Sequence, residues 1–175
     1  MNYIGMLLIV FSVFLSAETT LERAEKLYRM ESYAKAKQLF MRLAKQGDAS
    51  AQYDLAYLYE HGKGTPKDEM KALYWYVQAA KQGYTNAQYN AATFYYEGRG
   101  TKQDYKQALF WYRQAANSGD VQALYNLGVM YLKAQGVVRN KLKAYQFWME
   151  AAKIGYPKAE DSLDLLCQKS PWVCQ

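Results

Sequence analysis

Histidine is almost absent from this sequence of 175 residues, in which His61 is the only one. A Ser-His-Asp or Cys-His catalytic set would therefore have to be built around a single residue. Two Gly-x-Gly motifs end at Gly64 and Gly100, but no third glycine or P-loop Lys-Ser/Thr follows them and nothing strand-like precedes them. A phosphate-binding loop is thus not indicated. We expect no enzyme activity and no cofactor.

Cysteine is also scarce, since Cys167 and Cys174 are the only two and both lie near the end of the chain. Two thiols do not supply the four ligands that structural zinc usually takes, so no metal site is expected. An even number of cysteines in an exported chain favours a disulfide, which here would tie down the C-terminal segment. The alternative is a cytosolic protein with two free thiols.

Long apolar runs are missing apart from residues 4–15. That run is too short to span a bilayer comfortably, and Leu15-Ser16-Ala17 before Glu18 offers a cleavage point. We therefore predict a signal peptide over residues 1–17 and a periplasmic or secreted bacterial protein with no membrane span after cleavage. The segment before the run carries no Lys or Arg, and an uncleaved membrane anchor is the alternative.

Charge of one sign is not gathered into a stripe. The formal net charge is +6, but Lys and Arg are spread through the chain. A basic stripe with interleaved aromatic residues is missing, so no nucleic-acid partner is expected. We interpret most cations as solvated helix faces, and a weak attraction for acidic partners is the alternative. Apolar residues make up 51% of the chain, enough to bury a core.

One segment is repeated three times in the sequence. Residues 51–59 recur at 87–95 and 123–131, and residues 71–83 recur at 107–119 and 143–155, with a shift of 36 residues each time. A fixed period of this length is typical of repeat proteins, in which each unit buries its apolar face against its neighbours.

Each repeat is predicted to contain two helices. Ala51, Leu55 and Tyr59 have the spacing of one helical face and predict a first helix over about 49–61. The glycine loop at 62–64 ends it, and Gly83 ends the second helix as a C-cap glycine. Residues that favour the N-cap precede the second helices in register: Ser32, Asp68, Asp104 and Asn140.

The third copy departs from the pattern at two positions. Ala134 stands in the place of Gly98, and Phe147 stands in the place of Trp111. These replacements predict a slightly altered loop and core. The aromatic residues in repeat register are predicted to be core: Tyr59, Tyr95, Tyr131, Trp75 and Trp111.

The two end units are atypical, as expected for caps. Residues 18–47 lack the glycine loop, and they read as a helix that begins in a Thr19–Glu22 capping box and a second helix over 33–45. Residues 156–175 read as one helix over about 158–168, after which Trp172 and Cys174 can fold back onto it. The predicted domains are a signal peptide (1–17), an N-terminal unit (18–47), full repeats (48–83, 84–119, 120–155) and a C-terminal cap (156–175).

The pattern Ala-x3-Leu-Ala-x2-Tyr-x2-Gly-x-Gly-x3-Asp-x2-Lys-Ala-x2-Trp-x3-Ala-Ala-x2-Gly over 51–83, with close copies at 87–119 and 123–155, resembles the Sel1-like repeat. Residues 24–44 are more similar to a plain tetratricopeptide repeat. The resemblance implies an all-α fold, an α-solenoid of antiparallel helix pairs in a right-handed superhelix with roughly nine helices. It also implies a scaffold or adaptor role. Cysteine-rich members associated with β-lactam binding carry cysteines in every repeat, unlike this chain.

Ser32-Tyr-Ala-Lys35 has the S-x-x-K spacing of penicillin-recognising serine enzymes. The companion motifs S-D-N and K-T-G are absent, however, and Ser32 lies in the N-cap register of Asp68. We therefore interpret the motif as part of the repeat. Asp68 and Asp104 could suggest an acid–base pair, but helix capping explains both.

A binding groove is predicted on the first helix of each repeat, which lines the concave surface in tetratricopeptide-like solenoids. Asn and Asp side chains there could bracket an extended peptide, and Tyr adds contact area. A plain solvated face is the alternative. His61, whose position is held by Glu97 and Lys133 in the other copies, is interpreted as exposed rather than as a ligand or base. The candidate residues are Asp54, Tyr57, His61, Asn90, Thr93, Tyr96, Glu97, Asn126 and Val129.

The sequence therefore predicts an exported, non-enzymatic and monomeric scaffold that binds a protein or peptide of the bacterial envelope on its concave surface. One alternative is a β-lactam-hydrolysing enzyme acylated at Ser32. The other is a peptidoglycan-binding module, which the mild basic charge and the 18 tyrosines permit.

Overall fold

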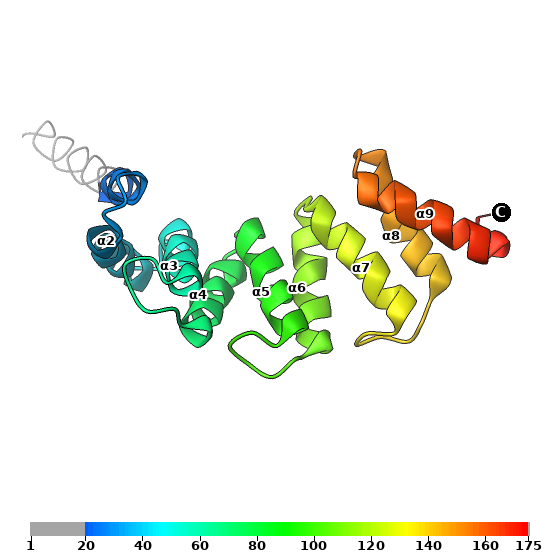
Figure 1. Cartoon of the computed structure of the whole chain (residues 1–175), viewed down its shortest axis with the longest axis horizontal. Coiled ribbons are helices and arrows are strands. Elements are labelled where there is room, and N and C mark those ends of the chain that lie inside the picture. The colour runs from blue at the N-terminus through cyan, green and yellow to red at the C-terminus, as the bar shows by residue number, and fades with distance from the viewer. Residues whose placement is uncertain (1–19, 175) are drawn as a thin grey trace, which may run out of the picture. The chain divides into compact units, whose positions relative to one another are not determined.

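The computed structural model describes residues 20–174 (Figure 1). The predicted signal peptide and Thr19 of the predicted capping box lie outside the described residues. Within them the chain is helical and contains no strand. Two compact units, residues 1–75 and 76–175, divide the chain within helix α4 (Glu69–Lys81), and each unit is described by itself.

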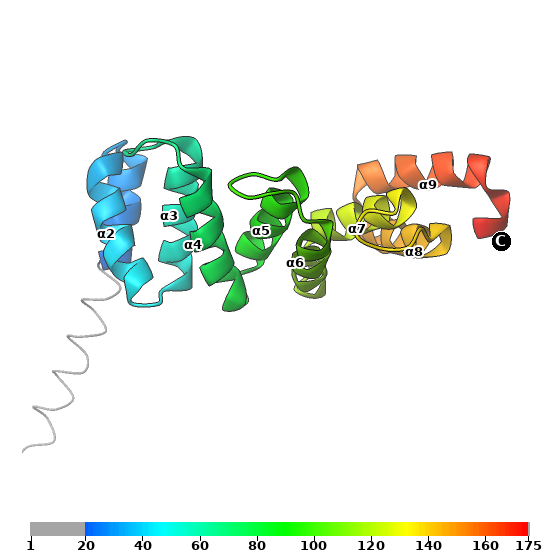
Figure 2. The same ribbon diagram turned by 90° about the horizontal axis from the view of Figure 1, so that it is seen from below.

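The first unit begins with a helix over residues 20–29, followed by α2 (Tyr33–Lys45), α3 (Ala49–His61) and the start of α4. Helices α2 and α3 pack side by side in opposite directions (Figures 1 and 2). The predicted spans 33–45 and 49–61 are confirmed. Buried apolar side chains from all three helices form the core between them: Ala24, Ala36, Phe40, Ala44, Ala51, Leu55 and Leu58.

The second unit continues the same pattern of packed helices (Figures 1 and 2). It contains α5 (Thr85–Glu97), α6 (Tyr105–Asn117), α7 (Val121–Lys133), α8 (Lys141–Lys153), α9 (Pro157–Lys169) and a 3-10 turn (Pro171–Val173). Each helix from α5 to α9 contacts the next. The predicted all-α solenoid of antiparallel helix pairs is confirmed. Among the described residues no helix has both the length and the apolarity needed to cross a membrane.

The turns that join one repeat to the next each need a glycine. Gly47, Gly83, Gly119 and Gly155 have φ between 85° and 96°, and a Cβ there would meet nothing within 4 Å. The residue after each glycine donates its N–H to a carbonyl five residues back, as in Tyr156 to Ala151 at 3.1 Å. This is the hydrogen bond of a Schellman C-cap, so the glycine is required for its positive φ alone.

The second glycine of the loop inside a repeat has another role, close packing. A Cβ on Gly64 would lie 2.5 Å from the backbone of Tyr33 and Ala34, and a Cβ on Gly136 would lie 2.7 Å from the carbonyl oxygen of Tyr105. These loops therefore rest directly on the first turn of the preceding second helix, α2 or α6. Any side chain at this position would push the two repeats apart.

The prediction of an altered loop in the third copy is wrong as far as the backbone is concerned, because the loop keeps the conformation of the other copies. Ala134 adopts φ 59°, the same left-handed conformation as Gly98 at 74°. The Gln135 N–H still donates to Met130 (3.0 Å), and the Asn140 N–H still donates to Tyr131 (3.0 Å). The surrounding hydrogen bonds thus hold the loop in shape although alanine is disfavoured there.

Three of the four predicted N-caps are confirmed. Asp68 and Asn140 each accept the N–H three residues ahead at 2.9 Å, and Asp104 accepts two N–H groups. Ser32 makes no side-chain cap, so that prediction is wrong. The tight turn before it places Glu31 at φ 58° and leaves Ser32 at ψ 53°, not in the extended conformation that an N-cap side chain needs.

The predicted aromatic core is partly correct. Tyr59, Tyr131 and Trp111 are buried, but Trp75 and Tyr95 are only half-buried. A more deeply buried line of the first helices lies one residue earlier than position 59, 95 or 131. It carries Leu58, Phe94 and Met130, each at most 1% exposed.

A disulfide joins Cys167 and Cys174, whose Cα atoms are 5.8 Å apart, and this confirms the predicted pairing. The tail folds back through Val173, which is 4% exposed, whereas Trp172 is 63% exposed. The expected packing of Trp172 is therefore wrong. The 3-10 turn directs Val173 inward and its neighbour outward.

Candidate functional site

A pocket of about 570 Å³ lies between α7, α8 and α9 in the second unit. It forms at the end of the repeats, where α9 is not followed by a second helix of its own in the described chain. We call it the terminal pocket. Its lining residues are Tyr125, Asn126, Val129, Leu132, Lys133, Arg139, Lys141, Trp148, Ser162, Leu165, Leu166, Lys169 and Ser170.

The floor of the terminal pocket is rigid and apolar. Trp148 is 3% exposed and donates its indole N–H to the carbonyl of Tyr125 at 3.0 Å, while the two rings stack at 6.2 Å. Gly128 makes this possible, because a Cβ at that position would overlap the indole ring. Val129 and Leu165 add apolar surface from α7 and α9. Such a fixed floor with polar groups around it is typical of a binding pocket.

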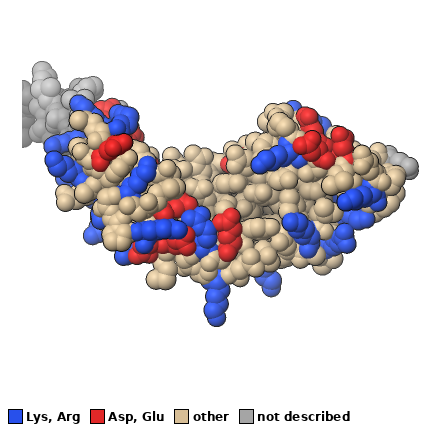
Figure 3. Space-filling model, in the orientation of Figure 1, with Lys and Arg blue, Asp and Glu red and all other residues tan. Residues whose placement is uncertain are grey.

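The rim of the terminal pocket is cationic. Lys133, Arg139, Lys141 and Lys169 line it, no Asp or Glu does, and within the described chain none of the four makes an ion pair. The Lys141 ammonium donates to the hydroxyl of Ser170 at 2.7 Å, and Ser170 is 3% exposed. In Figure 3 blue side chains gather over the loop after α7 and the end of α9. The unpaired positive charge thus favours an anionic ligand.

Two of the predicted groove residues, Asn126 and Val129, line this pocket. Asn126 also connects it to α5, because its side chain lies beside Tyr89, whose pKa is raised by burial and lowered in smaller part by Asn126. On α5, the Thr93 hydroxyl donates to the carbonyl of Tyr89 at 3.1 Å and lies 3.0 Å from the hydroxyl of Tyr112, whose pKa is also raised by burial. A strip of hydroxyl and amide groups therefore extends from α5 to the pocket.

The remaining predicted residues of the second repeat lie apart from the pocket. The Tyr96 hydroxyl donates to the side-chain oxygen of Gln135 at 3.1 Å. Glu97 is exposed, with its carboxylate 3.8 Å from Arg99, and Asn90 is half-buried on α5. Tyr96 thus links the end of α5 to the loop after α7, while Glu97 and Asn90 stay outside the terminal pocket.

In the first unit the predicted groove residues meet the chain's own lysine. The Lys63 ammonium lies 5.0, 5.1 and 5.3 Å from the ring centres of Tyr28, Tyr33 and Tyr57, and 2.8 Å from the Tyr28 hydroxyl. His61 is exposed as predicted and stacks on Tyr57 at 3.9 Å. We call these five residues the tyrosine–lysine cluster. Lys63 therefore occupies this helix face itself, and cation–π contacts and a hydrogen bond hold it there.

Asp54, the third predicted residue of α3, is a half-buried acid. Burial, together with the nearby carboxylates of Glu25 and Asp48, raises the pKa of Asp54 to about 7. Asp48 is itself the N-cap of α3 and accepts the Ala51 N–H at 2.7 Å. Because like charges and desolvation both favour the protonated acid, Asp54 is neutral through much of the acidic range.

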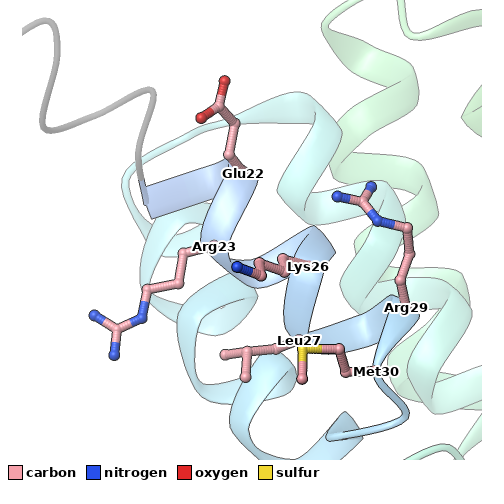
Figure 4. A pocket seen from close by; sticks show the side chains of 6 residues that line it. All are labelled: Glu22, Arg23, Lys26, Leu27, Arg29 and Met30. Carbon is pink, nitrogen blue, oxygen red and sulfur yellow. The ribbon is translucent and has the colours of Figure 1, made fainter.

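Two further concavities lie in the first unit. One, of about 700 Å³, is lined by Glu22, Arg23, Lys26, Leu27, Arg29 and Met30, all near or on one helix, and Figure 4 shows these side chains spread around it. The other, of about 670 Å³, is lined mainly by residues 21–25 and 43–48. Neither brings polar groups from several helices onto a fixed apolar floor as the terminal pocket does.

The S-x-x-K motif does not form a catalytic pair in the described structure. Ser32 and Lys35 share a backbone hydrogen bond of 3.1 Å from the Lys35 N–H to the Ser32 carbonyl, and no hydrogen bond joins their side chains. No group of three or more His, Cys, Asp or Glu residues suited to a metal ion occurs among residues 20–174.

Most of the cationic rim was not predicted from the sequence. Arg139, Lys141 and Lys169 come from a loop, the start of α8 and the end of α9, and each looks like an ordinary surface cation in the sequence. The sequence contains no signal that brings these three cations together, because they come from separate elements.

The helix pairs, the repeated caps and the pocket at the end of the repeats define a repeat protein of the α-solenoid class. The family model of the Sel1 repeat matches residues 49–84, 85–120 and 121–156. The chain therefore belongs to the Sel1 repeat family, whose members generally act as protein–protein interaction scaffolds.

Solved structures agree with this assignment. A Sel1 repeat protein from Oxalobacter formigenes is 36% identical with a TM-score of 0.73, and the match covers 74% of this chain and 54% of that one. A protective antigen from uropathogenic Escherichia coli is 40% identical with a TM-score of 0.69, covering 72% of this chain and 27% of that one. This chain thus spans about half or less of these two proteins.

The Helicobacter pylori cysteine-rich protein B is 20% identical, with a TM-score of 0.56 and coverage of 82% and 96%, and it supports the fold alone. A comparison with curated proteins gave no match.

Proposed function

We propose that this chain is an exported protein-interaction scaffold of the bacterial envelope that binds a segment of a partner protein in the terminal pocket. The observation that carries the proposal is the convergence of α7, α8 and α9 on a fixed apolar floor, with a cationic rim that makes no ion pair within the described residues. A binding role needs only these two features, whereas catalysis would need a nucleophile and base in contact, which Ser32 and Lys35 do not form.

The polar strip from Thr93 to Asn126 supports a segment longer than the pocket. Its hydroxyl groups join α5 to α6, and Asn126 of α7 lies beside Tyr89 of α5, so these groups present a preorganised surface beside the pocket. An extended peptide could continue along it from the pocket, and preorganisation lowers the entropy cost of binding.

The Cys167–Cys174 disulfide supports the proposed location, because disulfides persist in oxidising compartments such as the bacterial periplasm. Intact mass of the protein from fractionated cells tests it. We expect loss of residues 1–17 and a mass two protons lower before reduction than after it. A full-length chain with two free thiols in the cytosolic fraction would contradict export.

Site-specific photo-crosslinking in the native bacterium tests the binding role. A photoreactive amino acid replaces Val129 in the terminal pocket, and the matched control carries it at Gln146, an exposed position on α8 outside the pocket. We expect a discrete adduct only at position 129. The adduct partner, identified by mass spectrometry, should bind the purified scaffold. Equal labelling at both positions, or none at 129, would contradict the proposal.

A further inference from the structure

We infer that the terminal pocket selects an acidic segment of its protein partner, in which one apolar side chain is flanked by carboxylates. This inference rests on the proposed function and adds the chemistry of the partner. It follows from two separate features of the pocket, the sign of its rim and the nature of its floor.

The rim determines the charge of the partner. Four cations line one pocket of about 570 Å³ without a single carboxylate. The chain has 16 Asp and Glu residues, and elsewhere its cations do pair with them, as Lys71 does with Asp68 at 2.8 Å. Four like charges close together repel one another, so a ligand that brings negative charge relieves that repulsion.

The position of Lys141 shows that the rim is held in place by the fold and is not only a set of cations that lie near one another. Its ammonium is held at 2.7 Å by the hydroxyl of the buried Ser170, which is the residue before the 3-10 turn. One hydroxyl uses one of three ammonium donors, so two remain for a ligand. Lys141 also lies in the first turn of α8, where the helix N-terminus favours an anion as well.

The apolar floor indicates that negative charge alone does not give the ligand its full affinity. Leu165 is 51% exposed although it lines the pocket beside Val129 and the buried Trp148. An apolar side chain inserted here removes this surface from water, a gain that a free phosphate or a sugar chain could not obtain. The combination therefore favours an acidic peptide with an apolar anchor.

Binding of fluorescein-labelled peptides to the full chain, with its disulfide intact, tests the inference by fluorescence anisotropy. The first peptide has one leucine flanked on each side by two glutamates. The second replaces the leucine by alanine, and the third replaces the glutamates by glutamines. We expect the first peptide to bind about tenfold more tightly than either of the others, and its affinity to fall as salt rises from about 50 to 300 mM.

Two matched pairs of variants locate the effect. Lys133→Gln with Arg139→Gln should weaken binding of the first peptide about tenfold, whereas Lys106→Gln with Lys153→Gln removes the same charge outside the pocket and should leave it unchanged. Leu165→Ser should weaken binding about threefold, whereas Ile154→Ser, at another exposed apolar position, should not. All six substitutions are at exposed positions, so we expect folding to be preserved.

The outcomes separate this inference from the proposed function. If the adduct at position 129 forms but the acidic peptide binds no better than the glutamine peptide, the inference is wrong and the scaffold role stands. If neither occurs, both are wrong. Equal affinity for the leucine and alanine peptides, or competition by phosphate or anionic lipid vesicles at equal charge concentration, would show general anion binding and would also overturn it.

Discussion

The faces of the first and third repeats differ although their backbones follow the same pattern. In the first repeat Tyr57 and Lys63 belong to the tyrosine–lysine cluster, in which the lysine side chain covers the outer face of the helix. In the third repeat the same positions are Val129, which lines the terminal pocket, and Gln135, which accepts a hydrogen bond from Tyr96 instead. In the first repeat Lys63 occupies the face, whereas the cations around the terminal pocket make no ion pair within residues 20–174.

This difference shows that the repeat determines the backbone, whereas the positions between the repeated ones determine what a face can bind. Asp54 and Asn126 occupy the same register, yet the first is a half-buried acid with a raised pKa and the second is an uncharged amide that lines the terminal pocket. The following predictions test the contrast, beginning with the largest expected effect.

The first repeat should be destabilised by its own acid above neutral pH. Since the pKa of Asp54 is about 7 in the folded protein, against 3.8 ordinarily, folded Asp54 holds a proton that the unfolded chain has lost. Stability therefore falls as the pH rises from about 4 to 7 and is then constant. Asp54→Asn should add about 3 kcal/mol at pH 8 and little at pH 4, measured by urea unfolding at both pH values.

The control for this prediction is Asp161→Asn, which removes a carboxylate from an exposed position on α9. We expect it to change stability by less than about 0.5 kcal/mol at either pH. A gain from Asp54→Asn that is equal at pH 4 and pH 8 would contradict the raised pKa.

The floor of the third repeat depends on a matched pair of residues. Gly128→Ala should cost about 3 kcal/mol, because the new Cβ would overlap the indole of Trp148. The second repeat carries Ala92 and Tyr112 at these two positions. Trp148→Tyr in the Gly128→Ala background should therefore restore part of the loss. Additive losses in this double-mutant cycle, measured by thermal unfolding, would contradict the pairing.

The disulfide should matter for the C-terminal cap and not for the first repeat. It closes a short loop, so replacing Cys167 and Cys174 by serine should cost about 2 kcal/mol, confined to α9 and the 3-10 turn. Hydrogen exchange should show faster opening in residues 157–174 and unchanged protection in α3. Faster exchange in α3 as well would show that the bridge stabilises the whole chain.

The smallest effect concerns the loops. Ala134→Gly should stabilise the third repeat by about 1 kcal/mol, because only glycine takes a left-handed conformation without steric cost. The reverse change in the first repeat, Gly62→Ala, should cost about 1 kcal/mol or more, because φ is 66° there and the new Cβ would also lie in tight contact, 3.3 Å from the backbone nitrogen of Lys67. Both are measured by thermal unfolding. If both substitutions stabilised the protein, or both destabilised it, the explanation would be contradicted.

Much of the fold was predictable because its signals are local. Asp68, Asp104 and Asn140 cap the helices that follow them, and Gly83 ends a helix, through contacts within a few residues. Ser32 was mispredicted because a neighbouring turn, which the repeat pattern does not show, moved its backbone away from the N-cap conformation.

The candidate site was predictable only in part. The period placed Asn126 and Val129 on an outer helix face, and they do line the terminal pocket. It could not show that Lys63 would occupy the equivalent face of the first repeat, because that depends on Tyr28, which is 35 positions away along the chain.

The sequence by itself determined the helices, their caps, the repeat length and the family, since these follow from periodicity and short-range hydrogen bonds. It also determined that two cysteines close to each other would be available for a disulfide. Only the tertiary structure decided that Arg139, Lys141 and Lys169 surround one apolar floor with no carboxylate among them. The physical reason is that such a pocket depends on how side chains from separate helices pack, and the charge of each residue alone does not reveal its neighbours.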